Sequence, residues 1–73
     1  MEITIKREEG YIELIKLLKL TRLCATGGEA KTAVAKGLVR VDGQVEFRKK
    51  RKVRAGQRVE FDGNAVSVSL FRI

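Results

Sequence analysis

Apolar residues recur along this chain with two spacings, one typical of strands and the other of helices. Polar and apolar residues alternate over residues 2–6, which predicts a short strand with Ile3 and Ile5 on one face. The charged residues 7–10 end in glycine and are interpreted as a loop. Apolar residues then fall at helical spacing and predict a helix over about residues 10–20. Its core face comprises Tyr11, Leu14, Ile15 and Leu18, widened by Ile12, Leu17 and Leu20.

A second helix is predicted to begin after Thr26. The Thr26 hydroxyl fits an N-cap, and Glu29 lies three residues later, so the pair predicts a capping box. Gly37 is expected to end the helix, since glycine is the preferred residue just beyond a helix. The predicted buried face comprises Ala30, Ala33, Val34 and Leu38.

Two glycines, Gly27 and Gly28, fall in the first turn of this second helix. Glycine costs up to about 1 kcal/mol relative to alanine inside a helix. We therefore expect a close approach there, either of the first helix or of a ligand.

Short alternating runs fill the rest of the chain. Asp42-Gly43 lies between Val39–Val41 and residues 44–47, and such a pair predicts a type I′ hairpin turn with Arg40 facing away from Val39 and Val41. Residues 58–61 and 65–70 flank Asp62-Gly63 and predict a second hairpin. Its core candidates are Val59, Phe61, Val66 and Val68.

Between the two hairpins, residues 48–52 are all Lys or Arg and are interpreted as a solvated crossing. Val53 is then expected to return to the core. Ala55-Gly56 is expected to form a turn. Residues 71–73 form a tail without a pattern. The sequence predicts a single α+β domain spanning residues 1–73, with two N-terminal helices packed on a small antiparallel sheet with hairpins.

Positive charge is concentrated in one half of the chain. Residues 22–58 hold 11 basic and 3 acidic residues, a net charge of +8, whereas the remainder carries −1. A net charge of +7 predicts mutual repulsion at low salt and attraction to polyanions. We expect a monomer.

Residues that support catalysis are scarce. The chain lacks histidine, its single Cys24 has no partner for a zinc site or a disulfide, and no phosphate-binding loop motif occurs. Cys24 is interpreted as a small buried apolar residue in a protein of a reducing compartment. The charged N-terminus and the longest uncharged stretch, nine residues at 63–71, predict neither a signal peptide nor a membrane span. We expect a cytoplasmic protein without enzyme activity, cofactor, metal, membrane contact or small-molecule substrate.

Clustered Lys and Arg bind nucleic acid by neutralising phosphates, although a solvated charged face is the commoner role of such a cluster. The amides at the start of the second helix would hold an oxyanion, unless Thr26 only caps the helix. One Tyr and three Phe offer few platforms for base stacking, which favours a folded RNA backbone over single strands. The second helix has only Lys31 and Lys36 as long side chains, which disfavours reading of the DNA major groove. The candidate contacts are Thr26, Gly28, Lys31, Arg40, Arg48, Lys49, Lys50, Arg51, Lys52 and Arg54. An alternative function is docking onto an acidic protein partner on a ribosome or an RNA-processing enzyme.

Three stretches follow a known pattern: Leu23–Lys31 reads LCATGGEAK, Gly37–Gly43 reads GLVRVDG, and Val53–Val59 reads VRAGQRV. Through them, residues 11–61 resemble the S4 RNA-binding domain family, in particular the small stand-alone bacterial S4-like proteins of the YbcJ type. The Arg that follows the hydroxyl in the usual family motif is Gly27 here, and the motif's Asn is Asp42. The resemblance implies an αL motif that binds structured RNA, ribosomal or transfer RNA, through the helix start and the hairpin.

Overall fold

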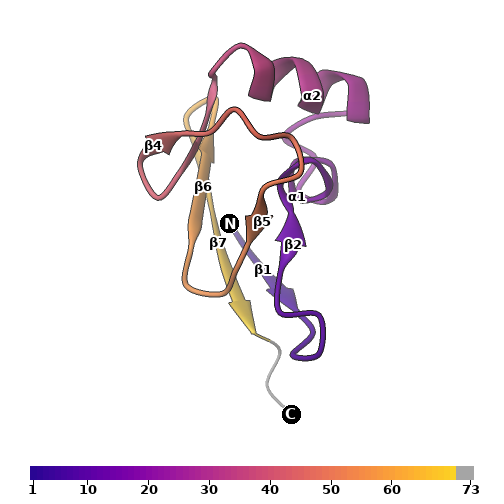
Figure 1. Cartoon of the computed structure of the whole chain (residues 1–73), viewed down its shortest axis with the longest axis vertical. Helices are drawn as coiled ribbons and strands as arrows, with labels where there is room; N and C mark the ends of the chain where they lie inside the picture. Colours follow the sequence, from indigo (N-terminus) through magenta and orange to yellow (C-terminus); the bar gives the residue numbers. More distant parts are fainter. Residues whose placement is uncertain (71–73) are drawn as a thin grey trace.

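In the computed structural model, which describes residues 1–70, two short helices cover one side of a five-stranded sheet, and a two-stranded ribbon lies beside them (Figure 1). The helices are α1 (Leu14–Leu20) and α2 (Gly27–Ala35). The strands are β1 (Glu2–Ile5), β2 (Ile12–Glu13), β3 (Val39–Val41), β4 (Gln44–Val45), β5 (Lys52–Val53), β6 (Arg58–Phe61) and β7 (Asn64–Leu70). The tail at residues 71–73 lies outside the described residues.

The larger sheet has the strand order β1-β7-β6-β3-β4, and the smaller one pairs β2 with β5. The prediction of an antiparallel sheet is wrong at one edge, because β1 runs parallel to β7, with Ile3 opposite Val68. The sheet is therefore mixed. The first helix also follows two strands, so the helices do not open the fold.

The core lies between the helices and one face of the larger sheet. Leu14, Leu17 and Leu18 of α1 are fully buried and share this core with Ala30 and Val34 of α2. Along the strands, residues facing this side are buried, including Val39, Val41, Val53, Val59, Val66 and Val68. Phe61 was predicted to be in the core but is only partly buried, at the edge of the cluster.

The predicted helix over residues 10–20 begins later, at Leu14. Gly10 has φ +71°, which is incompatible with a right-handed helix. Ile12 and Glu13 instead pair with Val53 and Lys52 as β2 and β5. Tyr11 therefore precedes the helix and does not belong to its core face.

The basic residues 48–52 are solvated, as predicted, with all but Arg51 exposed, but the segment is also fixed to the rest of the fold. Lys52 lies in β5, and the Arg51 carbonyl accepts the Leu14 backbone N–H at 2.8 Å. That amide begins α1 and would otherwise lack an acceptor, because Glu13 does not cap the helix with its side chain. The segment is held against α1 by this bond.

Helix α2 ends as expected but one prediction about its buried face is wrong. Gly37 has φ +73°, and the amides of Gly37 and Leu38 donate to the carbonyls of Val34 and Ala33, a Schellman motif. The chain leaves the helical path there, so Leu38 no longer follows the helical spacing and is 56% exposed.

Candidate nucleic-acid interface

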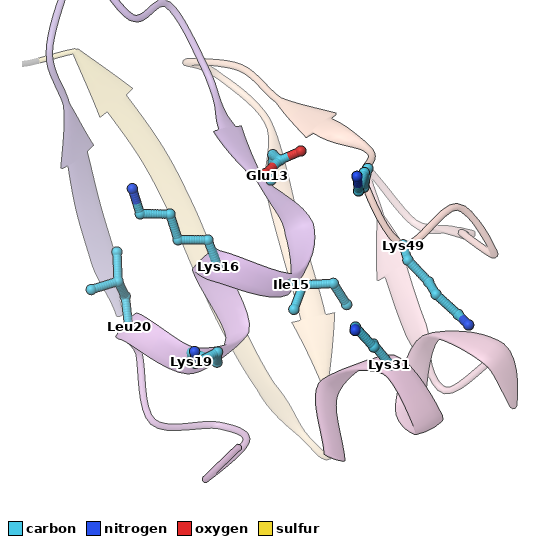
Figure 2. Close-up of a pocket in the computed structure, with 8 residues that line it drawn as sticks. Glu13, Ile15, Lys16, Lys19, Leu20, Lys31 and Lys49 are labelled. Atoms are coloured by element: carbon cyan, nitrogen blue, oxygen red, sulfur yellow. The ribbon is translucent and has the colours of Figure 1, made fainter. Parts of the chain in front are cut away.

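Five lysines from three segments line one cleft of about 510 Å³ (Figure 2). We call this hollow the lysine cleft. Its lysines are Lys16 and Lys19 of α1, Lys31 of α2, and Lys49 and Lys50 of the loop before β5. Its other lining residues are Glu13, Ile15 and Leu20.

The helices determine where these lysines point. Leu14, Leu17 and Leu18 turn one face of α1 into the core, which leaves Lys16 and Lys19 exposed three residues apart on another face. Burial of Ala30, Ala33 and Val34 likewise leaves Lys31 exposed on α2. Figure 2 shows Lys31 extending from α2 towards Ile15 of α1, with Lys49 on the neighbouring loop.

The cleft combines cations with an apolar floor. Leu20 is 61% exposed there, and Glu13 is its single carboxylate. The two ion pairs found within residues 1–70 are made by Arg48 and Arg51 with Glu46. None of the five lysines therefore lies within ion-pair distance of a carboxylate in that range. Their ammonium groups are therefore available to an external anion.

Sequence reasoning missed Lys16 and Lys19. Both lie outside the strongly basic half of the chain, so the charge count did not single them out. The available signal was their separation of three residues on a helix whose other face is apolar, which places both on the same exposed side.

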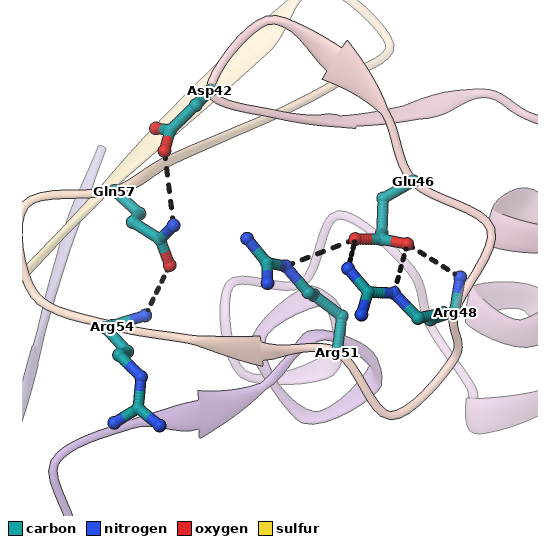
Figure 3. Close-up of polar contacts among 6 residues, drawn as sticks. All are labelled: Asp42, Glu46, Arg48, Arg51, Arg54 and Gln57. Atoms are coloured by element: carbon teal, nitrogen blue, oxygen red, sulfur yellow. Dashed lines mark hydrogen bonds and ion pairs between the residues drawn. The ribbon is translucent and has the colours of Figure 1, made fainter.

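The arginines of the basic segment behave differently from its lysines. Arg48 donates from Nε and Nη2 to the two carboxylate oxygens of Glu46, both at 3.1 Å, and Arg51 Nε lies 3.1 Å from Glu46 Oε1 (Figure 3). Hydrogen bonding from Arg48 lowers the pKa of Glu46 below its ordinary value. Two of the predicted contacts are thus paired with Glu46, although the Arg48 side chain remains 72% exposed.

Lys52 and Arg54 form the far side of the same segment. With Arg48, Lys50 and Arg51 they line a second hollow of about 480 Å³, which shares Lys50 with the lysine cleft. The Lys52 ammonium lies 4.8 Å from the centre of the Tyr11 ring, and the Arg54 guanidinium lies 6.0 Å from it. The two cations lie against the Tyr11 ring, so less of the ring is open for an RNA base to stack on it.

Arg40 lies apart from these residues. Its strand alternates buried Val39, exposed Arg40 and buried Val41, so Arg40 is on the sheet face that points away from the core. There it lines a different hollow together with Arg58 and Glu60. The structure therefore does not bring Arg40 into the lysine cleft.

The start of α2 is capped by its own side chains. The Thr26 hydroxyl accepts the Glu29 N–H at 3.1 Å, and the Glu29 carboxylate accepts the Ala25 N–H at 2.7 Å. The Thr26 half of the predicted capping box is present, whereas the Glu29 carboxylate reaches one residue further back, to the Ala25 N–H in place of the Thr26 N–H. This arrangement occupies the Thr26 hydroxyl as an acceptor and places a negative charge beside Gly28.

Of the two close approaches expected at the glycines, that of the first helix is not found, and that of a ligand stays a prediction. A Cβ added at Gly27 would lie 3.8 Å from the Lys19 side chain, and one at Gly28 would lie 3.8 Å from the Thr26 hydroxyl. Both are ordinary contact distances, so packing does not require glycine at either position.

Cys24 is buried, as predicted. Burial, and secondarily the charge of Glu29, raises the pKa of its thiol, which disfavours the thiolate. Among residues 1–70, acidic and cysteine side chains form no cluster of three or more that would hold a metal ion. Neither helix in that range is long and apolar enough to cross a membrane.

The comparisons with known proteins agree with this architecture. A family model described as the S4 domain matches residues 3–69. The chain belongs to the S4 domain family. The protein named "Putative RNA-binding protein YbcJ" from Escherichia coli (strain K12) is 50% identical over 58 residues, covering 80% of this chain and 83% of YbcJ. "Uncharacterized protein YbcJ" from Shigella flexneri matches to the same extent.

A solved structure supports the fold independently. The solution structure of YbcJ from E. coli, described as revealing an αL motif involved in RNA binding, superimposes with a TM-score of 0.70 at 43% identity. The match covers 93% of this chain and 85% of that chain. The small domain with two helices and a mixed sheet therefore has the S4 fold.

Proposed function

We propose that this protein binds structured RNA, ribosomal or transfer RNA, through the lysine cleft and has no catalytic activity of its own. The observation that carries the proposal is that five lysines from α1, α2 and the loop before β5 line one cleft. Membership of the S4 domain family and the RNA-binding description of YbcJ support the ligand class.

The surroundings of the cleft favour recognition of an RNA backbone. Lys52 and Arg54 surround the Tyr11 ring, and Phe61 is partly buried. Phe47 is exposed, but its ring packs along Gly37 and does not line the lysine cleft. Ammonium groups without stacking partners contact phosphates and ribose, so RNA shape would be recognised before base sequence.

Salt dependence of binding to an RNA hairpin tests the proposal. If about five phosphates are neutralised, the logarithm of the association constant falls with the logarithm of salt concentration at a slope of roughly −3.5 to −4.5. Fluorescence anisotropy across a salt series measures this slope. A slope near zero, or no binding at low salt, would contradict the proposed function.

Docking onto an acidic protein partner is the second candidate, and the exposed Leu20 within the lysine cleft favours it. Capture of partners with and without ribonuclease treatment separates the two functions. Under the RNA-binding proposal, captured proteins are lost when RNA is digested. An acidic protein retained after digestion would favour docking.

A further inference from the structure

Glu46 is the only acidic residue between Asp42 and Glu60, and it lies beside the most basic segment of the chain. Its side chain is only 12% exposed. A carboxylate at this position would repel an approaching polyanion, so its role in a nucleic-acid-binding protein requires an explanation.

The carboxylate of Glu46 contacts Arg48 and Arg51, the residues that flank Lys49 and Lys50 in the sequence (Figure 3). Its Oε2 accepts the Arg48 backbone N–H at 3.0 Å and Arg48 Nε at 3.1 Å, while its Oε1 accepts Arg48 Nη2 at 3.1 Å. Arg51 Nε approaches Oε1 to 3.1 Å as an ion pair, although its N–H is not aligned with an acceptor among residues 1–70.

Backbone hydrogen bonds fix the same loop at three points. The Glu46 N–H donates to the Val39 carbonyl at 3.0 Å, and the Arg51 N–H donates to the Arg48 carbonyl at 3.2 Å. The Arg51 carbonyl in turn accepts the Leu14 N–H at the start of α1. The loop is thereby closed on itself and attached to β3 and α1, with Lys49 and Lys50 at its turn.

We propose that Glu46 is a positioning residue for RNA binding, which holds Arg48 and Arg51 so that Lys49 and Lys50 are presented to the lysine cleft. In this arrangement the two arginines are internal supports, and the two lysines make the phosphate contacts. The inference rests on the proposed function and adds to it a division of roles within residues 46–51.

The two explanations of Glu46 predict effects of opposite sign. If only net charge determines affinity, removal of a carboxylate near the interface strengthens binding to RNA. If Glu46 positions the loop, its removal weakens binding although the protein becomes more positive, because ordering two lysines then costs conformational entropy on binding.

The experiment measures affinity for one RNA hairpin across a salt series for the unsubstituted protein, Glu46→Gln and the control Glu8→Gln. Glu8 is exposed in the loop after β1, and its substitution changes net charge by the same amount. We expect Glu46→Gln to bind on the order of fivefold more weakly, with a salt slope shallower by about one, as fewer phosphates are neutralised. Glu8→Gln should bind equally or slightly more tightly.

Two substitutions that conserve charge provide the second test. Circular dichroism verifies that each variant is folded at the assay temperature. Arg48→Lys retains the charge but removes the fork that contacts both oxygens of Glu46. The control Arg40→Lys makes the same exchange on the outer face of the sheet, where Arg40 forms no ion pair among residues 1–70. We expect weaker binding and a shallower slope only for Arg48→Lys.

The outcomes separate the inference from the proposed function. Unchanged or tighter binding by both Glu46→Gln and Arg48→Lys, or weaker binding with an unchanged salt slope, would overturn the positioning role alone. Failure of the unsubstituted protein to bind RNA would overturn the proposed function and the inference with it.

Discussion

The lysine cleft and the outer face of the sheet both carry positive charge, but they present it differently. In the cleft, five lysines face one hollow that holds a single carboxylate. On the outer face, Arg40 and Arg58 share their hollow with Glu60 and Asp62, and Arg40 stands directly opposite Glu60 across the β3–β6 pair. The lysine cleft therefore presents its positive charge with fewer acidic residues beside it than the outer face does.

The same contrast exists within the basic segment. Arg48 and Arg51 pair with Glu46, whereas Lys49 and Lys50 reach the cleft. Within residues 1–70, the two arginines are therefore engaged by a carboxylate of the chain, whereas the two lysines are not. A count of charges along the sequence does not distinguish these two roles.

The largest expected effect on RNA affinity comes from removing two positive charges from the lysine cleft, compared with removing two from the outer face of the sheet. Lys31→Gln with Lys49→Gln should weaken RNA-hairpin binding by about 10- to 30-fold and make the salt slope shallower by about 1.5 to 2. Arg40→Gln with Arg58→Gln removes the same charge from the outer face and should change affinity by no more than about threefold. Anisotropy titrations measure both. Equal losses would show that net charge, not the cleft, governs binding.

A smaller effect is expected from the two lysines of α1. Lys16→Gln with Lys19→Gln should reduce affinity by about five- to tenfold, because both residues face the cleft but lie outside the loop that Glu46 holds. The same titration measures this loss. An affinity equal to that of the unsubstituted protein would restrict the interface to α2 and the basic segment.

The smallest effect is expected at the start of α2, where the Glu29 carboxylate lies. The lysine cleft, in contrast, has Glu13 as its one carboxylate. Gly28→Ala should raise the free energy of unfolding by about 0.5–1 kcal/mol and leave RNA affinity unchanged, because the added Cβ meets only ordinary contacts. Denaturant unfolding and anisotropy measure the two quantities. A loss of affinity would instead show that RNA approaches the Gly28 backbone.

Gly37→Ala is the matched control for that substitution. Gly37 has φ +73°, and a Cβ there would lie 3.1 Å from the Phe47 ring, so this variant should be destabilised by about 1–2 kcal/mol. Similar stabilities of the two alanine variants would contradict the structural distinction between these glycines.

Local patterns predicted much of the fold. The N-cap at Thr26 and the helix end at Gly37 depend on neighbouring residues, so the sequence contains their signals. The same is true of the buried strand positions Val39, Val41, Val59, Val66 and Val68. The β2–β5 ribbon was missed because Ile12 pairs with Val53, a distant partner that spacing alone does not reveal. The parallel pairing of β1 with β7 was missed for the same reason.

The candidate site was predicted less completely. Lys31, Lys49 and Lys50 were named in advance and meet in the cleft, whereas Lys16 and Lys19 reach it only because α1 and α2 pack together. The separation of Arg40 from the cleft depends on which sheet face is covered by helices. The pairing of Arg48 and Arg51 with Glu46 depends on loop closure, which residue types do not specify.

Chemical-shift mapping gives the sharpest test of where this protein binds RNA. When the ¹⁵N-labelled protein is titrated with an RNA hairpin, we expect the largest amide shifts in α1, around Lys31 of α2 and at Lys49 and Lys50. We expect small shifts at Arg40, Arg58 and Ser67 on the outer face of the sheet. Shifts concentrated on that outer face, with the lysine cleft unperturbed, would contradict RNA binding through the cleft.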